Sequence, residues 1–334
     1  MNLKGIHILG IAAVILLLAS CHKKEEETEI EPYLDGVLSF SIPSYVLPSV
    51  KYTLVPSGAS NPTTGNVGYC WSGSWDSVTD TTKTETGPGD GSWDVTMPSE
   101  IGVYTIYCRA FASGYSYLSA EKEICVIDPT VGVSLTGTSY QIDSVKLEDP
   151  RDGGIYYLAT SGDKVWTQNN LYYEGSGVPY DYSTAIDPIF GRLYTWQEAV
   201  TACPEGWHLP SDAEFAALAS SFVEGSSYKA GENFSGAAGA LMADAYFLGS
   251  KMWAFWPDVK ITDKSKFSAI PVGYAIDQES RQKYVGMNSY AVFWTSDDDG
   301  DAGIYRYIYV DKNNVFVAKG DKTSFRASVR CVKD

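Results

Sequence analysis

The stretch Cys203-Pro204-Glu205-Gly206-Trp207-His208-Leu209-Pro210-Ser211 lies between two segments whose apolar residues recur at helical spacing. Upstream, residues 194–202 predict a short helix, which Pro204 ends because proline lacks the backbone N–H that a helix needs. Downstream, Ser211 and Glu214 form a capping box that begins a second helix. The stretch therefore predicts a short connection between two helices.

Strand patterns follow these helices along the chain. Residues 236–247 predict a third helix, and from Phe267 onward runs rich in Tyr, Val and Phe alternate with polar loops at 297–301 and 311–314. Helices early and antiparallel strands late are the arrangement of an α+β domain. We therefore expect an α+β domain in the C-terminal half.

Further motifs lie on both sides of residues 203–211 in a set order. They are residues 149–153 (DPRDG), 165–171 (VWTQNNL), 191–196 (GRLYTW), 267–274 (FSAIPVGY), 293–296 (FWTS) and 328–332 (SVRCV). In this order and spacing, residues 142–334 resemble the Fibrobacter succinogenes major paralogous domain, a module of bacterial cell-surface lipoproteins. One departure is Thr167-Gln168-Asn169, where the family tends to have Met-Ala-Glu, so the acidic residue beside Asn170 is missing.

The resemblance implies a C-type-lectin-like fold, to which this family is related. In such folds a disulfide ties the first helix to the last strand, and the resemblance assigns this bridge to Cys203 and Cys331. The alternative is a thiolate pair that binds a metal, as in formylglycine-generating enzymes, which share the lectin-like core. We favour the bridge, because the resemblance places both cysteines at that helix-to-strand disulfide, whereas the working thiols of those enzymes line a cleft. Oxidising conditions beyond the inner membrane allow the bridge.

Residues 34–129 predict a separate all-β domain. Short β-rich runs alternate with turn residues, and about seven such strands are the content of an immunoglobulin-like sandwich. The run Gly102-Val103-Tyr104-Thr105-Ile106 resembles the penultimate strand of immunoglobulin-like or polycystic-kidney-disease-type repeats. Residues 130–141, rich in Ser, Thr and Gly, predict a linker, so the fold class is a β-sandwich followed by a lectin-like α+β domain.

The N-terminus carries the features of a lipoprotein signal peptide, predicted over residues 1–20. About thirteen mostly apolar residues end at Leu18-Ala19-Ser20-Cys21, and a run this short falls below the ~20 residues that span a bilayer. The segment resembles a bacterial lipobox, which implies that Cys21 is acylated and becomes the mature N-terminus. A buried helix with an incidental cysteine is the alternative, but the charged residues that follow leave it nothing to pack against.

Residues 21–33 predict a solvated tether, because they are too charged to be buried. Their acidic run resembles the surface-export signals of Bacteroidetes lipoproteins. We therefore expect an outer-membrane protein, lipid-anchored and exposed at the cell surface. A spacer that faces the periplasm is the alternative.

Composition excludes several functions. The chain has 41 acidic and 25 basic residues, and a net charge of −16 would repel nucleic acid. Of its three histidines only His208 falls in an expected domain, so catalysis by clustered histidines is not expected. No cofactor is expected, and no carboxylate pair stands out as the catalytic pair of a glycoside hydrolase.

The remaining cysteines and charged motifs give weaker hypotheses. In the sandwich, a bridge between Cys70 and Cys108 is slightly favoured over one between Cys108 and Cys125. His208 is interpreted as a structural residue that caps backbone carbonyls, since no second metal ligand is near. The acidic run offers Asp297, Asp299 and Asp301 as candidate calcium ligands, with a solvated hairpin loop as the favoured alternative.

Aromatic residues make up 13% of the chain, and exposed Trp and Tyr dominate binding surfaces. Trp253, Trp256 and Tyr290 are the candidate ligand contacts, because they fall where lectin-like folds have long loops; core packing is the alternative. We expect a non-catalytic binding or adhesion module for glycans or surface components. The other hypotheses are a structural surface protein and a carboxylate-based enzyme that acts on polysaccharide.

Overall fold

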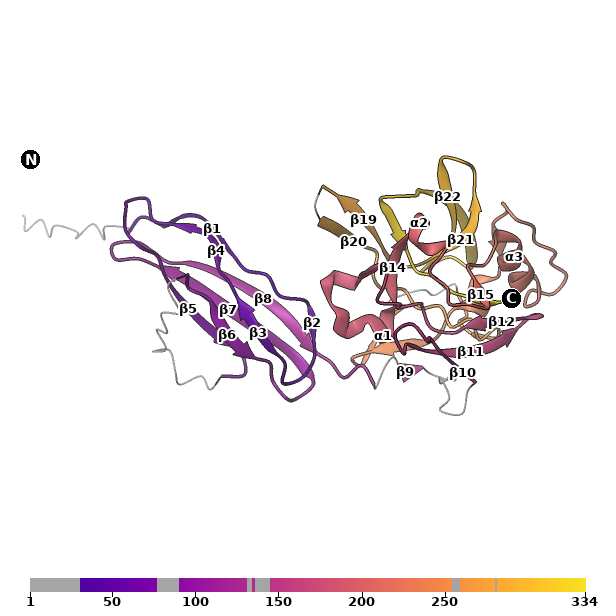
Figure 1. The fold of residues 1–334 in the computed structure, drawn as a ribbon, viewed down its shortest axis with the longest axis horizontal. Helices are drawn as coiled ribbons and strands as arrows, with labels where there is room; N and C mark the ends of the chain where they lie inside the picture. The colour runs from indigo at the N-terminus through magenta and orange to yellow at the C-terminus, as the bar shows by residue number, and fades with distance from the viewer. Residues whose placement is uncertain (1–30, 77–89, 131–133, 136–144, 254–258, 280) are drawn as a thin grey trace, which may run out of the picture.

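The computed structural model describes residues 31–76, 90–130, 134–135, 145–253, 259–279 and 281–334. Figure 1 shows them as two bodies laid end to end, the sandwich (residues 31–130) and the head (residues 134–334). The predicted signal peptide and Cys21 lie outside the described residues. Within the described ranges, no helix has both the length and the apolar character to cross a membrane.

The sandwich consists of three small sheets around one core. Its strands are β1 (Asp35–Ser39), β2 (Tyr45–Val46), β3 (Lys51–Leu54), β4 (Ser57–Ser60), β5 (Gly68–Gly73), β6 (Trp93–Thr96), β7 (Gly102–Phe111) and β8 (Leu118–Val126). The sheets have the orders β2-β8-β7-β5, β3-β6 and β1-β4. Inward side chains from all three sheets, including Leu38, Leu54 and Ile106, share one hydrophobic core. The predicted all-β character of the N-terminal part is confirmed.

The register of β5 and β7 corrects the predicted Cys70–Cys108 bridge. Cys70 lies opposite Arg109, while Cys108 lies opposite Trp71. Because neighbouring residues of a strand point to opposite faces, the two cysteine side chains leave the sheet on opposite sides. Cys108 is a buried free thiol in the sandwich core. Cys125, near the end of β8, is a buried free thiol in a different cluster, so the alternative Cys108–Cys125 bridge is not formed either.

The head is also built mainly from strands. They are β9 (Ser134–Leu135), β10 (Lys146–Glu148), β11 (Ile155–Ser161), β12 (Lys164–Thr167), β13 (Val178–Pro179), β14 (Arg192–Thr195), β15 (Trp207–His208), β16 (Phe234–Ser235), β17 (Ala245–Phe247), β18 (Ser250–Lys251), β19 (Tyr274–Gln278), β20 (Arg281–Val285), β21 (Tyr290–Asp298), β22 (Ala302–Tyr309), β23 (Asn314–Asp321), β24 (Phe325–Ala327) and β25 (Val332–Lys333). They form four sheets, ordered β10-β11-β12-β25-β15, β13-β14-β24-β19-β20, β16-β23-β22-β21 and β18-β17-β9.

The helices of the head are short. They are η1 (Tyr180–Tyr182), η2 (Thr184–Ile186), α1 (Asp187–Phe190), α2 (Trp196–Ala199), α3 (Asp212–Ser220) and α4 (Ala238–Leu241). Both parts of the structure are thus mostly β, with fewer and shorter helices than the α+β expectation for the head.

Of the three predicted helices, one begins where expected and two are shorter than predicted. Helix α3 begins as expected, since Ser211 accepts from the Glu214 N–H in a complete capping box. The helix predicted over 194–202 shrinks to α2, because Tyr194 and Thr195 pair with β24. The helix predicted over 236–247 shrinks to α4, after which the Ala243 N–H donates to the Ala269 carbonyl and the chain enters β17.

The Cys203–Cys331 disulfide is present, as the family resemblance implied. Its Cα atoms are 5.8 Å apart, and it joins the segment after α2 to the residue before β25 across 128 residues of sequence. Cys331 is fully buried beside Tyr194 and Leu209 in one of the head's hydrophobic clusters. The bridge therefore ties the segment after α2 to the start of the last strand.

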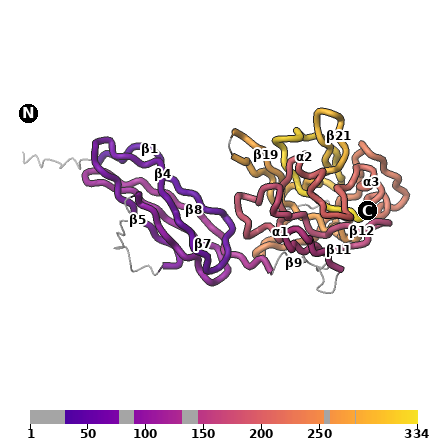
Figure 2. The backbone as a smooth tube through the Cα atoms, in the orientation of Figure 1, coloured from indigo at the N-terminus to yellow at the C-terminus, as the bar shows by residue number. Residues whose placement is uncertain are grey.

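The sandwich meets the head through a shared hydrophobic cluster, which we call the joint. Cys125 and Ile127 from the end of the sandwich pack with Phe190 and Phe247 of the head. The ring of Tyr45 contacts both phenylalanines edge-on, with centroids 5.9 and 5.8 Å away. Figure 1 labels β2 at the end of the sandwich that faces the head, and Figure 2 shows the same end of the sandwich as a tube.

Candidate functional site

Strand β22 has one face in the core and one aromatic outer face. Arg306 and Ile308 point inward and are buried, while Tyr305, Tyr307 and Tyr309 alternate with them and remain half-exposed. Alternation of this kind follows from the two-residue period of a strand. The outer face of an antiparallel sheet usually carries polar side chains where it meets solvent, so three tyrosines in a row are unusual there.

Neighbouring strands extend this surface. Tyr290 of β21 lies opposite Tyr309, Val292 lies opposite Tyr307, and Phe316 of β23 lies opposite Tyr307 on the other side. Paired residues share a face of the sheet, so these side chains continue the same surface. We call this surface the tyrosine face. Its members are Tyr274, Ile276, Tyr290, Val292, Tyr305, Tyr307, Tyr309, Lys312, Phe316, Ala318 and Phe325.

Ring contacts hold the tyrosines in place. Phe325 stacks on Tyr305 with a centroid distance of 4.7 Å and on Tyr274 with one of 5.2 Å. Tyr307 stacks on Phe316 at 5.0 Å. Aromatic pairs of this kind contribute about 0.5–1.5 kcal/mol each beyond their buried area. These contacts therefore fix the positions of the rings relative to one another.

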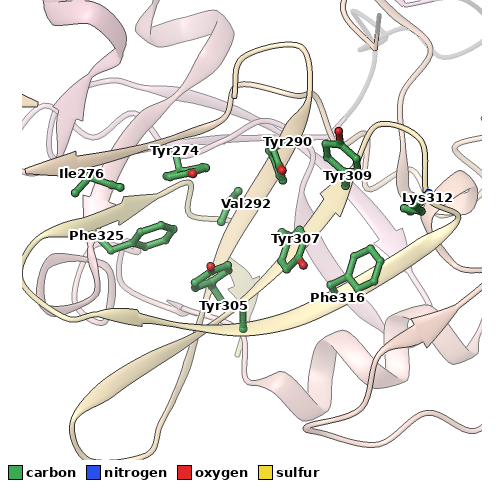
Figure 3. A pocket seen from close by; sticks show the side chains of 11 residues that line it. Tyr274, Ile276, Tyr290, Val292, Tyr305, Tyr307, Tyr309, Lys312, Phe316 and Phe325 are labelled. Atoms are coloured by element: carbon green, nitrogen blue, oxygen red, sulfur yellow. The ribbon is translucent and has the colours of Figure 1, made fainter. Parts of the chain in front are cut away.

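The tyrosine face encloses a shallow, open hollow of about 470 Å³. Figure 3 shows its side chains spread from Ile276, Tyr274 and Phe325 at one end to Lys312 at the other. Most of the lining is aromatic or aliphatic, and Lys312 is the one residue in it that is charged at neutral pH. A hollow lined by apolar groups with a few polar atoms has the character of a ligand site.

The hydroxyl groups of this surface are free to bind a ligand. Elsewhere in the head, Tyr172 donates to the Ile155 carbonyl at 3.1 Å, and Tyr284 donates to the Pro179 carbonyl at 2.8 Å. By contrast, the five hydroxyls of the tyrosine face, on Tyr274, Tyr290, Tyr305, Tyr307 and Tyr309, have no hydrogen-bond partner among the described residues. Each can both donate and accept.

Two of these hydroxyls, on Tyr290 and Tyr305, have a raised pKa. Burial, and then the neighbouring Tyr309 and Tyr274, raise the pKa of Tyr290. Burial and the neighbouring Tyr307 likewise raise the pKa of Tyr305. Both groups are therefore hydrogen-bond donors under physiological conditions and are poor candidates for nucleophiles.

The family model of the Fibrobacter succinogenes major domain matches residues 151–333. The chain belongs to this family. Every residue of the tyrosine face lies inside the matched range, and so do Cys203 and Cys331. The sandwich lies outside it, so the candidate site lies in the matched part of the chain.

Other comparisons add little. No curated protein matches this chain. The solved structure of the Yersinia pseudotuberculosis adhesin InvE is similar over 91% of this chain and 71% of the adhesin chain, with 12% sequence identity and a TM-score of 0.25. A TM-score this low supports no conclusion about fold or function.

The structure separates the three aromatic residues expected to contact a ligand. Trp253 is fully buried in the core of the head, where its indole Nε1 donates to the Ala269 carbonyl at 3.3 Å, so it is a packing residue. Trp256 lies outside the described residues. Tyr290 is half-exposed and belongs to the tyrosine face. The alternating tyrosines of β22 are the signal in the sequence that could have located the rest.

The acidic run does not bring its carboxylates together. Asp297 accepts from the backbone N–H of Asp212, at the start of α3, over 2.6 Å. Asp299 pairs with Lys319 at 2.6 Å, and Asp301 lies exposed in the loop. No group of three or more His, Cys, Asp or Glu side chains that could hold a metal ion occurs among the residues that the structure describes. The run is a hairpin loop braced by lysines.

His208 lies away from the tyrosine face and contacts carboxylates. Its Nδ1 is 2.6 Å from Asp334 Oδ1, and its Nε2 is 3.0 Å from Glu214 Oε1. The prediction that His208 caps backbone carbonyls is therefore wrong, because its partners are the carboxylates of Asp334 and Glu214. The residue links α3 to the end of the last strand.

Proposed function

We propose that this protein is a non-catalytic binding or adhesion module, and that the tyrosine face is its contact surface. The observation that carries the proposal is the set of five tyrosyl hydroxyls with no hydrogen-bond partner among the residues that the structure describes, on an outer sheet face organised by ring stacking. Exposed aromatic surface of this kind marks sites of interaction. The ligand class is a glycan or another component of a host or bacterial surface.

The non-catalytic part of the proposal rests on the chemistry of the lining. A catalytic site needs a nucleophile, an acid or base, or a metal-binding set. Lys312 is exposed and belongs to the lining, but no histidine, cysteine or carboxylate lines the hollow with it. These side chains can therefore recognise a ligand without breaking its bonds.

We also propose the setting of this module. Residues 1–20 are a lipoprotein signal peptide, Cys21 carries the lipid, and residues 21–33 are a tether on the outside of the outer membrane. Residues 34–129 form a sandwich that holds the head away from the membrane. Residues 130–141 are a linker, but Ser134–Leu135 within it forms β9 and pairs with β17, so the head takes in this part of the linker together with residues 142–334. The Cys203–Cys331 bridge supports a C-type-lectin-like origin for this head.

Array binding tests the contact surface. Residues 22–334 are probed on glycan and matrix-protein arrays, as wild type and as the Tyr290→Ala/Tyr307→Ala variant. The matched control is Tyr107→Ala, an exposed tyrosine on β7 of the sandwich. We expect wild type and control to bind the same spots and the double variant to lose them. Binding that is unchanged in the double variant, or absent in the wild type, contradicts the proposal.

Fractionation tests the setting. Cys21→Ala is expected to move the protein from the outer-membrane fraction to the soluble fraction, because acyl chains provide the anchor. Protease added to whole cells is expected to cut the wild type together with a known surface marker. A wild type that stays intact while the marker is cut would rule out outward display.

A further inference from the structure

The charge of the tyrosine face restricts what can bind to it. The side chain of Lys312 has its Nζ 3.5 Å from Asp311 Oδ1, so the one cation of the lining has a carboxylate beside it. The chain as a whole has a net charge of −16. A ligand with a negative charge on each repeating unit needs several cations to neutralise it, as nucleic acids do. The face therefore suits an uncharged ligand.

The backbone of the face is not available for pairing. Strand β22 is hydrogen-bonded to β21 on one side and to β23 on the other, along most of its length. Extended peptides that bind sheets do so mainly through the main chain at an open edge. A ligand on the tyrosine face can therefore be held by side chains alone, mainly by ring surfaces and hydroxyl groups, with Lys312 at one end.

The spacing of these groups indicates a ligand with repeating units. Tyr305, Tyr307 and Tyr309 recur at every second residue of β22, so their Cα atoms span about 13 Å at the rise of a β-strand. Phe316 and Tyr290 widen the same surface on either side. Each unit of the ligand would meet an apolar ring and a hydroxyl that donates or accepts.

We infer that the tyrosine face binds a chain of uncharged sugar rings. A sugar ring combines apolar C–H patches with a rim of hydroxyls. This matches tyrosine rings whose hydroxyls have no hydrogen-bond partner in the described part of the chain. This inference rests on the proposed function and narrows its ligand class to neutral oligosaccharides. A matrix protein, an acidic polysaccharide and a second copy of the chain are the other occupants that the experiment separates.

The experiment is calorimetric titration of residues 22–334 with hexasaccharides. The neutral probes are the glucose, xylose, mannose and N-acetylglucosamine oligomers, and the acidic probe is the galacturonic acid oligomer. We expect at least one neutral probe to bind with an affinity that added salt leaves unchanged, because no ion pair is screened. Binding that is confined to the acidic probe, or that salt abolishes, overturns the inference.

Two variants identify the atoms involved. Tyr305→Phe/Tyr307→Phe/Tyr309→Phe keeps the rings and removes three hydroxyls, and we expect it to weaken neutral binding at least tenfold, because a hydrogen bond is worth about two- to tenfold in affinity. Tyr107→Phe on the sandwich is the control and should bind like the wild type. Equal binding by the triple variant overturns the role of the hydroxyls.

The outcomes also separate this inference from the proposed function. If no neutral sugar binds but a matrix protein binds in a way that Tyr290→Ala/Tyr307→Ala abolishes, the contact surface stands and the sugar ligand is wrong. If dilution shows a dimer that the same variant dissociates, a second copy occupies the face and the sugar ligand is again wrong. If nothing depends on these tyrosines, both proposals fail.

Discussion

His208 is held between two carboxylates, and this sets its protonation. Burial alone would lower the pKa of His208, but the hydrogen bonds and negative charges of Asp334 and Glu214 outweigh burial and raise it. The protonated ring donates from both nitrogens, so it connects the end of the chain to α3. The pKa of Glu214 is lowered in turn, against burial, by its hydrogen bonds to Ser211 and His208.

We predict that His208 makes the stability of the protein depend on pH. Because its pKa in the folded state is raised, its contribution is complete below the unfolded value of about 6.5 and is lost as pH rises through the folded value. The free energy of unfolding should therefore fall between about pH 6 and pH 8.5, and His208→Gln should reduce that fall. Urea titrations at both pH values measure it.

His208 is well suited to this test, because His7 and His22 both precede the described residues. A variant in which His22 is replaced by Gln is the matched control and should keep the pH dependence of the wild type. Equal pH dependence in wild type and His208→Gln would show that the carboxylate contacts do not persist in solution.

Arg306 is the inward neighbour of the outer tyrosines, and it is fully buried. Its Nη2 donates to Asp212 Oδ2 at 2.8 Å, and its guanidinium lies 3.8 Å from the ring centroid of Phe234. Because Asp212 is at the start of α3, the pair joins this helix to the sheet beneath the tyrosine face. Of the buried pair, Asp212 belongs to α3 and Arg306 belongs to β22.

We predict that breaking this pair destabilises the head strongly. Asp212→Asn should lower the free energy of unfolding by about 3–5 kcal/mol, because it leaves a buried guanidinium without its counter-charge. The combined Asp212→Leu/Arg306→Met variant should cost less than either Leu or Met change alone, since no unpaired charge remains. Additive losses in urea unfolding would contradict this account.

At the scale of elements, the sequence predicted caps and strands better than helix lengths. The Ser211 to Glu214 capping box is local, so its pattern located the start of α3. The lengths of α2 and α4 depend on pairing with β24 and on the contact with Ala269, both far away in sequence, and no local pattern contains them. The same limit applies to the site, because an aromatic run such as that at Trp253 does not show which residues face inward.

We predict that truncation on the inner face of β22 lowers stability, whereas truncation on its outer face lowers binding. Ile308→Ala should cost about 2–5 kcal/mol of stability, because it leaves a cavity in the core. Tyr307→Ala should cost less than about 1.5 kcal/mol, since it loses mainly the stacking on Phe316. Urea unfolding measures stability, and the arrays measure binding. Of the two variants, only Tyr307→Ala should abolish binding. Equal destabilisation by both variants would place the tyrosines in a core.

At the scale of the whole molecule, the joint determines whether the orientation of the head relative to the sandwich is fixed. Tyr45 links the sandwich to the head, with its ring against Phe190 and Phe247 and its hydroxyl 3.8 Å from Met287 Sδ. Ser183 donates its hydroxyl to the Tyr45 carbonyl, and Ser44 donates to the Asp181 carboxylate. These contacts combine apolar packing with hydrogen bonds, so we expect the sandwich and the head to unfold together.

We predict that Tyr45→Ala uncouples the two parts. Loss of the half-buried ring should remove roughly 2 kcal/mol from the contact between sandwich and head, about half the cost of truncating a fully buried aromatic residue. Calorimetry should then resolve two transitions where the wild type shows one, and small-angle scattering should show a wider range of particle lengths. Tyr52→Ala is the control, because Tyr52 packs inside the sandwich, away from the joint; it should lower the melting temperature without splitting the transition. A split transition in the wild type, or the same profile in both variants, would mean that the joint transmits no stability and that the sandwich carries the head on a loose connection.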